Sequence, residues 1–342
     1  MTTDILDALS DPDGAVRRAG ELLRGGQLVA IPTETVYGLA ARIDDTEALG
    51  RIFRVKGRPQ DNPLIVHCSA REQVDEVVDW SVVDTADRTI VERLMEAFWP
   101  GPLTLVLPRT AVVDAIVSAG LDTVAVRIPG LDITRRIIEE AGMPLAAPSA
   151  NRSGRPSPTT AEHVMDDLQA TIAAVVDGGP CQEGLESTVV RVVGGRIVVL
   201  RPGSVTRVQL HEVSGAAVVD PERVDDTAHS PGTRYRHYAP VASMILVDSV
   251  DEIGTSYVNV ASAGDGTEPL RIVMLATSDP GLPGIEWRPL LPSTLFAELR
   301  RADRLHVEKI IVLCDEAVRR NEALMNRLRK AAEPTHGTSE TK

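Results

Sequence analysis

Two cationic side chains of different chemistry lie two positions apart at Lys56 and Arg58. They stand in the segment 56–63, where Gly57 lets the chain bend and two prolines fix the backbone. An ammonium is a movable point charge, whereas a guanidinium binds a carboxylate or phosphate through two parallel hydrogen bonds. The pattern predicts a turn that presents both cations to an anion. A solvated basic turn is the alternative interpretation.

Lysine is rare in this chain. Of 36 basic residues only four are lysines, and Lys56 is the only one before Lys309. An amine with adjustable geometry is therefore favoured at Lys56 over another guanidinium.

Polar side chains follow two short apolar runs. The run 28–31 leads directly to Thr33, and the run 145–147 leads to Ser149 and Asn151. Ligands of α/β sheets are held at strand ends and in the loops that follow them. The sequence predicts binding positions at these three residues, although a plain polar loop explains Thr33 almost as well.

A predicted hairpin supplies a further cation. Strands 188–193 and 196–200 turn over Gly194-Gly195, and the second ends at Arg201. Ser204 is placed to cap a helix over 205–213, whose N-terminal amides favour an anion.

Residues 214–240 read as a linker because charge, proline and glycine replace hydrophobic periodicity. Its second half carries Tyr235, between Arg234 and Arg236, followed by His237, and such side chains stack on bases and bind phosphates. A linker docked on a domain surface is the alternative.

Alternating helical and strand patterns flank this linker and predict an α/β protein of two domains, 13–213 and 241–332, followed by a disordered tail at 333–342. The expected helices are 13–24, 46–55, 85–98, 132–140, 205–213, 294–302 and 316–331. The expected strands are 28–31, 64–67, 103–107, 123–128, 145–147, 173–176, 188–193, 196–200, 243–247, 271–275 and 309–313.

Composition narrows the function classes. The 342 residues are 43% hydrophobic and carry a formal charge of −13, which opposes nonspecific nucleic-acid binding and favours a small, enclosed anionic ligand. Cys68, Cys181 and Cys314 lack the spacing of a zinc site or a disulfide framework. No secretion signal or 18-residue apolar run occurs, so we expect a cytoplasmic protein without a membrane partner.

Together these segments resemble the YrdC-like threonylcarbamoyl-AMP synthase family in its two-domain form. The matching motifs, in family order, are Pro-Thr-Glu-Thr-x-Tyr-Gly at 32–38, Lys-x-Arg-Pro at 56–59, Ser-x-Asn at 149–151, Ser-Thr at 187–188 and Arg-Pro-Gly at 201–203. The linker segment 230–240 is similar to the signature of the longer members, with Thr233 where methionine is common, and 324–328 resembles their C-terminal helix.

The resemblance implies that L-threonine, bicarbonate and ATP give threonylcarbamoyl-AMP and pyrophosphate, and that a separate transferase carries the threonylcarbamoyl group to tRNA. It implies roles for Lys56 and Arg58 at the carbamate and triphosphate, and for Thr33 and Ser187 at threonine. The expected nucleotide ligands are Lys56, Ser149, Asn151, Arg201, Tyr235 and His237. Mg²⁺ is expected to accompany ATP through phosphate and water, since the sequence offers no dedicated carboxylate cage.

The implied fold is a twisted mixed-sheet YrdC-like domain with a concave basic pocket crossed by the linker, plus a smaller Rossmann-like α/β domain. The alternative from another class is an RNA-binding module that uses the same concave surface, which the acidic net charge disfavours. In the enzyme no stable direct tRNA binding is required. A third interpretation places catalysis in the C-terminal domain, but no glycine-rich phosphate loop follows strand 243–247.

Overall fold

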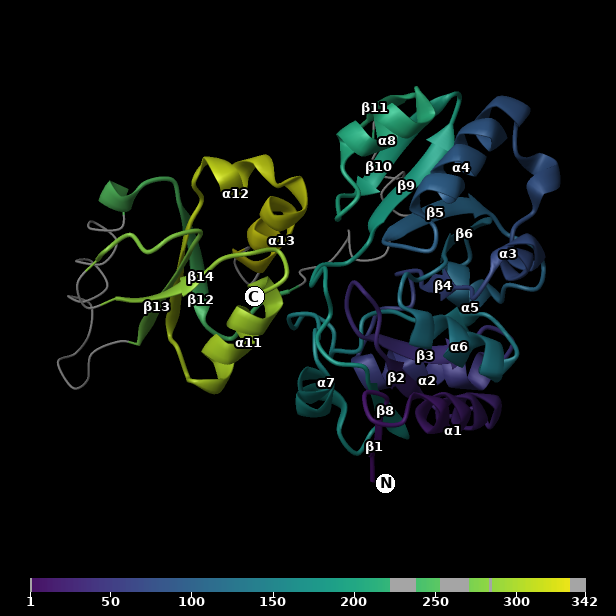
Figure 1. Cartoon of the computed structure of the whole chain (residues 1–342), viewed down its shortest axis with the longest axis horizontal. Helices are drawn as coiled ribbons and strands as arrows, with labels where there is room; N and C mark the ends of the chain where they lie inside the picture. The colour runs from purple at the N-terminus through teal and green to yellow at the C-terminus, as the bar shows by residue number, and fades with distance from the viewer. Residues whose placement is uncertain (1, 222–237, 253–270, 283–284, 333–342) are drawn as a thin grey trace, which may run out of the picture. The chain divides into compact units, whose positions relative to one another are not determined.

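The computed structural model describes residues 2–221, 238–252, 271–282 and 285–332 (Figure 1). Contacts divide the chain into two compact units. Unit 1 comprises residues 1–153 and 157–235, and unit 2 comprises residues 154–156 and 236–342. Tyr235, His237 and the predicted tail 333–342 lie outside the described residues, so the expectations for them stay predictions. Among the helices that the structure describes, none is long and apolar enough to cross a membrane.

Unit 1 is built on a mixed sheet of eleven strands within the described part of the chain, in the order β1-β8-β2-β3-β7-β4-β6-β5-β9-β10-β11. In chain order the strands are β1 (Asp4–Asp7), β2 (Val29–Ile31), β3 (Gly38–Arg42), β4 (Ile65–His67), β5 (Leu103–Pro108), β6 (Thr123–Arg127), β7 (Leu145–Ala146), β8 (Ala174–Asp177), β9 (Thr188–Val193), β10 (Arg196–Arg201) and β11 (Ala217–Val219). Parallel and antiparallel pairs both occur: β4 pairs parallel with β6, and β5 pairs antiparallel with β6. The predicted mixed sheet is confirmed.

The central strands are apolar on both sides because helices cover both faces of the sheet. In β2, Val29 and Ile31 pack in the core cluster that contains α1 and α6 residues, whereas Ala30 between them packs in the cluster that contains α2 and α4 residues. This alternation follows from the period of two in a strand. It explains why the run 28–31 is continuously hydrophobic.

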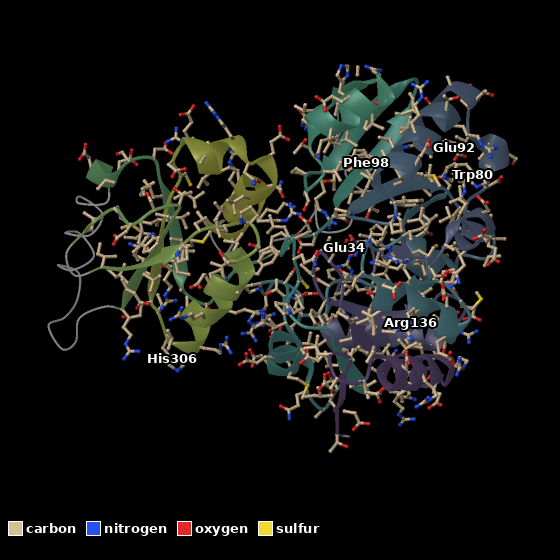
Figure 2. All side chains as sticks on the ribbon, viewed as in Figure 1. Glu34, Trp80, Glu92, Phe98, Arg136 and His306 are labelled. Atoms are coloured by element: carbon tan, nitrogen blue, oxygen red, sulfur yellow. The ribbon has the colours of Figure 1, made fainter. Side chains whose placement is uncertain are left out.

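Most helices of unit 1 begin at side-chain caps that the sequence supplies, whereas α3 and α6 begin without one. The helices are α1 (Pro12–Arg24), α2 (Thr46–Lys56), α3 (Arg71–Val77), the 3₁₀ turn η1 (Trp80–Val82), α4 (Thr85–Phe98), α5 (Ala115–Ser118), α6 (Asp132–Ala141), α7 (Ala161–Leu168) and α8 (Arg207–Ser214). The carboxylates of Asp11, Asp45 and Asp84 accept backbone N–H groups at the starts of α1, α2 and α4. Arg136 of α6 donates to Asp13 of α1, which joins these two neighbouring helices (Figure 2).

Unit 2 carries a four-stranded, all-parallel sheet in the order β12-β15-β13-β14. Its elements are β12 (Ser243–Val247), β13 (Ile272–Ala276), β14 (Glu286–Pro289), α11 (Leu295–Arg304), β15 (Lys309–Leu313), α12 (Glu316–Arg320) and α13 (Glu322–Ala332). A parallel sheet in which α11 connects β14 to β15 agrees with the predicted Rossmann-like domain.

Three local predictions were wrong. The helix expected over 205–213 begins at Arg207, and its cap is the Thr206 hydroxyl rather than Ser204. The helix expected over 316–331 is interrupted at Asn321. Four strands were not foreseen, β1, β3, β11 and β14, and β11 lies inside the range interpreted as linker. Each is too short, or too polar at its ends, to be identified from hydrophobic periodicity.

Candidate active site

Lys56 is the last residue of α2 rather than part of a turn, so that prediction was wrong. Gly57 takes the left-handed conformation (φ 62°) that ends the helix. The Lys56 side chain is only 3% exposed, and its ammonium donates to the backbone oxygens of Ser149 and Asn151, the latter at 2.5 Å. Two motifs that are about ninety residues apart are therefore joined by one buried amine.

Arg58 is oriented by its own loop. Its Nε donates to the Asn62 oxygen (3.2 Å) and its Nη2 to the Pro63 oxygen (2.8 Å). Both acceptors lie within five residues of Arg58 along the chain, so these bonds are local to the loop. The structure thus holds the guanidinium in a fixed direction beside the end of α2.

The segment after β7 is braced against the segment after β2. Ser149 forms an isolated antiparallel bridge with Gly38, and its hydroxyl donates to Asn151 Oδ1 at 2.6 Å. A Cβ on Gly38 would come within 3.1 Å of the Ala147 Cβ, which is why glycine ends the Pro-Thr-Glu-Thr-x-Tyr-Gly motif. Both predicted nucleotide ligands of this segment, Ser149 and Asn151, are brought to the Lys56 ammonium.

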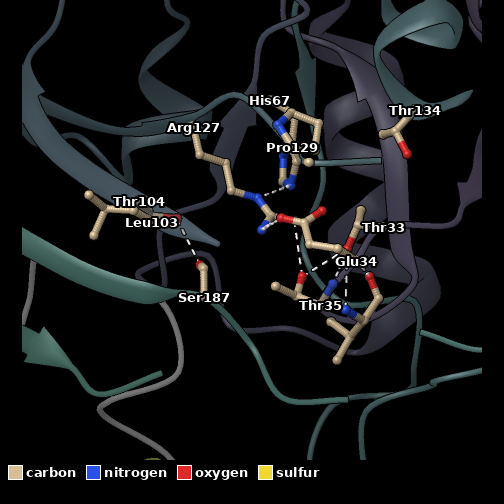
Figure 3. A network of polar contacts seen from close by, with 12 residues as sticks. Thr33, Glu34, Thr35, His67, Leu103, Thr104, Arg127, Pro129, Thr134 and Ser187 are labelled. Carbon is tan, nitrogen blue, oxygen red and sulfur yellow. Dashed lines mark hydrogen bonds and ion pairs between the residues drawn. The ribbon is translucent and has the colours of Figure 1, made fainter. Parts of the chain in front are cut away.

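Thr33 is buried, and its hydroxyl is used within its own turn. The hydroxyl donates to the Val36 oxygen (2.7 Å), accepts from the backbone N–H groups of Thr35 and Val36, and lies 2.8 Å from the Thr35 hydroxyl (Figure 3). One hydroxyl has one proton and two lone pairs. The predicted contact of Thr33 with threonine therefore stays a prediction, and the geometry assigns this hydroxyl to shaping the loop.

Arg127 is the centre of a buried network that sequence reasoning missed. Its Nε donates to His67 Nε2 (3.0 Å), its Nη1 to Glu34 Oε1 (3.1 Å) and its Nη2 to Thr35 Oγ1 (3.1 Å) (Figure 3). The His67 Nδ1 lies 3.2 Å from the Ile65 oxygen, which fixes the tautomer with the proton on Nδ1. Burial, assisted by the charge of Arg127, holds the pKa of His67 well below its ordinary value, so the imidazole is neutral.

A signal for this network exists in the sequence. His67 is the last residue of the predicted strand 64–67, and Arg127 is the second-to-last residue of the predicted strand 123–128. In the structure they end β4 and β6, which pair in parallel with His67 opposite Arg127. Glu34 stands between the two threonines of the first motif and has one carboxylate oxygen, Oε2, that is buried and finds no partner among the described residues. A cationic side chain that ends an apolar strand is the feature to notice.

Ser187 and Arg201 meet at a second point of the site. The Arg201 Nε and Nη2 both donate to the Ser187 backbone oxygen (3.1 and 3.0 Å), and Nη2 also reaches the Ser187 hydroxyl at 3.2 Å. That hydroxyl lies 2.8 Å from the hydroxyl of Thr104 on β5 (Figure 3). A Cβ on Gly203 would fall 2.3 Å from the Thr188 nitrogen, so the Arg-Pro-Gly motif needs its glycine for this close approach.

The arrangement can bind anions and offers little to a metal. Buried guanidinium and ammonium groups lie among hydroxyls, and within the described residues no group of three or more histidine, cysteine, aspartate or glutamate side chains could hold a metal ion. The thiol of Cys181 is not activated, because burial raises its pKa to about 12.

Comparison with known proteins identifies the family of this chain. Residues 21–203 match the Sua5/YciO/YrdC family model, described as "Telomere recombination", and residues 205–333 match the model of the threonylcarbamoyl-AMP synthase C-terminal domain. The chain therefore belongs to the Sua5/YciO/YrdC family, in the form that carries this C-terminal domain.

Individual relatives of this chain carry a more specific name than the family does. The threonylcarbamoyl-AMP synthase of Pyrococcus abyssi is 40% identical over 93% of this chain and 94% of its own. That of Bacillus subtilis is 44% identical over 73% of this chain and 71% of its own. The crystal structure of P. abyssi Sua5 complexed with L-threonine superposes with a TM-score of 0.84 at 36% identity, covering 97% of this chain and 98% of the other. The predicted fold and family are confirmed.

Proposed function

We propose that this chain is an L-threonylcarbamoyladenylate synthase, which uses L-threonine, bicarbonate and ATP. The observation that carries the proposal is the identity of 40% with the P. abyssi synthase over nearly the full length of both chains. The P. abyssi structure with L-threonine supports an amino-acid site in the same fold.

The reaction needs two bonds to form. The threonine amine and bicarbonate condense to a carbamate with loss of water, and a carbamate oxygen then attacks the α-phosphorus of ATP while pyrophosphate leaves. Both partners are anions, so catalysis consists of positioning them and neutralising their charge. No nucleophilic side chain is required, which suits a site of hydroxyls, amides and cations.

Each described residue of the site has one role in binding these substrates. Lys56 and Arg58 lie between carbamate and triphosphate, and Ser149, Asn151 and Arg201 face the nucleotide phosphates. Arg127, held by Glu34 and His67, is suited to the threonine carboxylate, because a buried guanidinium with two directed neighbours is pre-organised for an anion.

Thr33 and Ser187 enclose the same amino acid, the former through the shape of its turn and the latter through the Ser187 hydroxyl beside Arg201. Tyr235 and His237 would close over ATP from the linker. Mg²⁺ would be held mainly by phosphate oxygens and water and would neutralise the leaving pyrophosphate, since hydroxyls and amides dominate the described donor set. The product passes to a separate tRNA threonylcarbamoyltransferase.

The test is pyrophosphate release without tRNA. Release should require threonine and bicarbonate together, because the attacking oxygen belongs to the carbamate. Undiminished release in carbonate-depleted buffer would instead mean that the threonine carboxylate attacks directly. Release without threonine would mean simple nucleotide hydrolysis.

A further inference from the structure

Thr104 carries the one hydroxyl of an otherwise apolar strand, β5, and is fully buried. A hydroxyl inside a protein costs free energy unless it is hydrogen-bonded. Among the described residues the Thr104 hydroxyl has one hydrogen-bond partner, the hydroxyl of Ser187 at 2.8 Å (Figure 3). The contact with Ser187 is therefore what offsets the cost of burying Thr104.

The sheet of unit 1 places Thr104 between two parts of the candidate site. In the strand order β5 lies between β6 and β9. It pairs on one side with β6, which ends at Arg127, and on the other with β9, which begins directly after Ser187. Thr104 thus lies on the strand that separates the buried guanidinium of Arg127 from the Ser187 hydroxyl.

The chemistry of hydroxyl groups decides which of the two side chains donates. A hydroxyl has one proton and two lone pairs. If Ser187 donated to Thr104, the Thr104 proton would be buried without an acceptor among the described residues, and a buried donor left unpaired carries its full desolvation penalty. Thr104 is therefore the donor and the Ser187 oxygen the acceptor.

The second lone pair of Ser187 is occupied by Arg201. The Arg201 Nη2 donates to the Ser187 hydroxyl oxygen at 3.2 Å, and a guanidinium can only donate. With both lone pairs of this oxygen in use, Ser187 has only its proton left for a ligand. That proton has no acceptor among the described residues.

We infer that Thr104 is a positioning residue that makes Ser187 a pure hydrogen-bond donor toward the amino-acid substrate. The Ser187 proton is directed at an oxygen of that substrate, in its carboxylate or its side-chain hydroxyl. The substrate ammonium is excluded from this point, because an ammonium has no lone pair to accept the proton. The inference rests on the proposed function, because it takes the substrate to be L-threonine.

The experiment compares Thr104→Val with wild type in the full chain. Valine has nearly the shape of threonine and suits an apolar strand. The Kd for L-threonine, measured by calorimetry, should rise about fivefold to tenfold, since one oriented hydrogen bond is worth about that factor. The Kd for ATP should stay within about twofold of wild type, because Arg201 keeps its contacts with Ser187. Thr104→Ser should bind threonine within about threefold of wild type, because serine keeps the hydroxyl.

A double-mutant cycle separates positioning from packing. In a Ser187→Ala background, Thr104→Val should change the Kd for L-threonine by less than about twofold, because Thr104 acts only through Ser187. A packing defect would weaken binding equally in both backgrounds and would overturn the inference. Thr110→Val is the matched control, since its hydroxyl also makes one hydrogen bond, to the Glu76 oxygen, and lies beyond the far end of β5. It should leave the Kd unchanged.

Titration with (S)-2-aminobutyrate, which is L-threonine without its hydroxyl, identifies the acceptor oxygen. If Thr104→Val still weakens binding of this ligand, Ser187 donates to the carboxylate. If both proteins bind it equally while they differ with L-threonine, Ser187 donates to the substrate hydroxyl. Either result supports a donor role for Ser187.

Two results overturn the inference alone. One is folded Thr104→Val protein with a wild-type Kd for L-threonine, and the other is tighter binding, which would mean that the ligand donates to the lone pair that the substitution frees. If Thr104→Val does not fold, Thr104→Ala gives the same comparison, because alanine also lacks the hydroxyl and adds no bulk. Wild-type protein that binds no L-threonine overturns the proposed function together with the inference.

Discussion

Two of the arginine–glutamate pairs in unit 1 have opposite surroundings. Arg127 and Glu34 have side chains 3% and 9% exposed, whereas Arg71 and Glu92 are 36% and 39% exposed. The exposed pair is bidentate, with Arg71 donating to both Glu92 oxygens at 2.6 and 2.8 Å, while the buried pair is joined by one hydrogen bond of 3.1 Å. The better-formed pair is therefore the one in solvent.

The pKa of each arginine shows which effect dominates. The hydrogen bonds that Arg71 donates to Glu92 raise the pKa of Arg71, whereas burial lowers the pKa of Arg127 even though Glu34 opposes that change. Desolvation thus outweighs pairing at Arg127, as it commonly does for buried ions. A charge kept inside the protein at such a cost favours a ligand-binding role for Arg127 and a surface role for Arg71.

The largest effect is expected from Arg127→Met. Removing one partner leaves the Glu34 carboxylate buried and uncompensated, which should lower the free energy of unfolding by about 3–5 kcal/mol and abolish threonine binding. Urea denaturation and calorimetry measure the two effects. The control is Arg127→Met combined with Glu34→Gln, which should recover much of the stability but none of the binding. If Arg127→Met is as stable as wild type, Arg127 does not compensate a buried charge on Glu34.

Lys56→Ala removes a buried ammonium that donates to the backbone oxygens of Ser149 and Asn151. The variant should keep its fold and lower turnover by about a hundredfold or more, since losing one charge-assisted contact to developing charge costs about 3 kcal/mol. Pyrophosphate release and circular dichroism are the measurements. Lys309→Ala, in β15 of unit 2, is the matched control and should retain wild-type activity. Near wild-type release from Lys56→Ala would contradict the assignment.

His67 gives the buried network a pH dependence that begins near pH 6.5, whereas that of the exposed pair begins only in more acid solution, near the ordinary pKa of a glutamate. Its pKa in the folded protein lies below the unfolded value of about 6.5. As the pH falls below about 6.5, His67 binds a proton in the unfolded chain but not in the folded chain. The free energy of unfolding therefore decreases by up to about 1.4 kcal/mol per pH unit. Above that pH the group contributes no slope.

The check is unfolding by urea between about pH 5 and pH 7. His67→Gln should remove this part of the slope, because glutamine does not titrate and its oxygen can still accept from Arg127. His306→Gln is the control, since His306 is exposed (Figure 2). Equal slopes in wild type and His67→Gln would show that His67 titrates normally in the folded state.

The sequence predicted the elements whose patterns are local. The helix 85–98 and the strands 188–193, 243–247 and 309–313 have the expected bounds, because hydrophobic periodicity and flanking turn residues define them without reference to the rest of the chain. Ser187 and Arg201 were assigned to different ligands, threonine and the nucleotide phosphates, and the hairpin between them makes them neighbours in space.

The Arg127 network could not be predicted in the same way because it depends on strand order. His67 meets Arg127 only because β4 pairs with β6 in one register, and Thr35 meets Arg127 across a separation of 92 residues. The orientation of the Lys56 side chain likewise depends on the tertiary structure, since the ammonium donates to backbone oxygens of a loop far along the chain. Local residue types indicate which groups are chemically capable, and sheet topology decides which of them meet.

The smallest effect is expected from Arg71→Met, which removes the exposed pair. Arg71 also lies 5.0 Å from the Trp80 ring and donates to Asp75 at 2.9 Å, so the substitution deletes several contacts at once. Each contact is screened by water, and exposed ion pairs contribute about 0–1 kcal/mol, so the variant should lose no more than about 1 kcal/mol. The loss should shrink as salt is added, because ions screen exposed charges.

Activity is the more telling measurement for Arg71→Met. A surface pair that plays no part in binding should leave pyrophosphate release and threonine affinity unchanged, while the Arg127→Met variant loses both. Glu92→Gln should behave like Arg71→Met near neutral pH, and its deficit should vanish in acid, because Arg71 lowers the pKa of Glu92 and the stability it supplies is lost as the pH falls through that lowered value. A loss above about 2 kcal/mol, or a loss of activity, would mean that exposure does not separate the two pairs and that the surface of α4 takes part in the reaction.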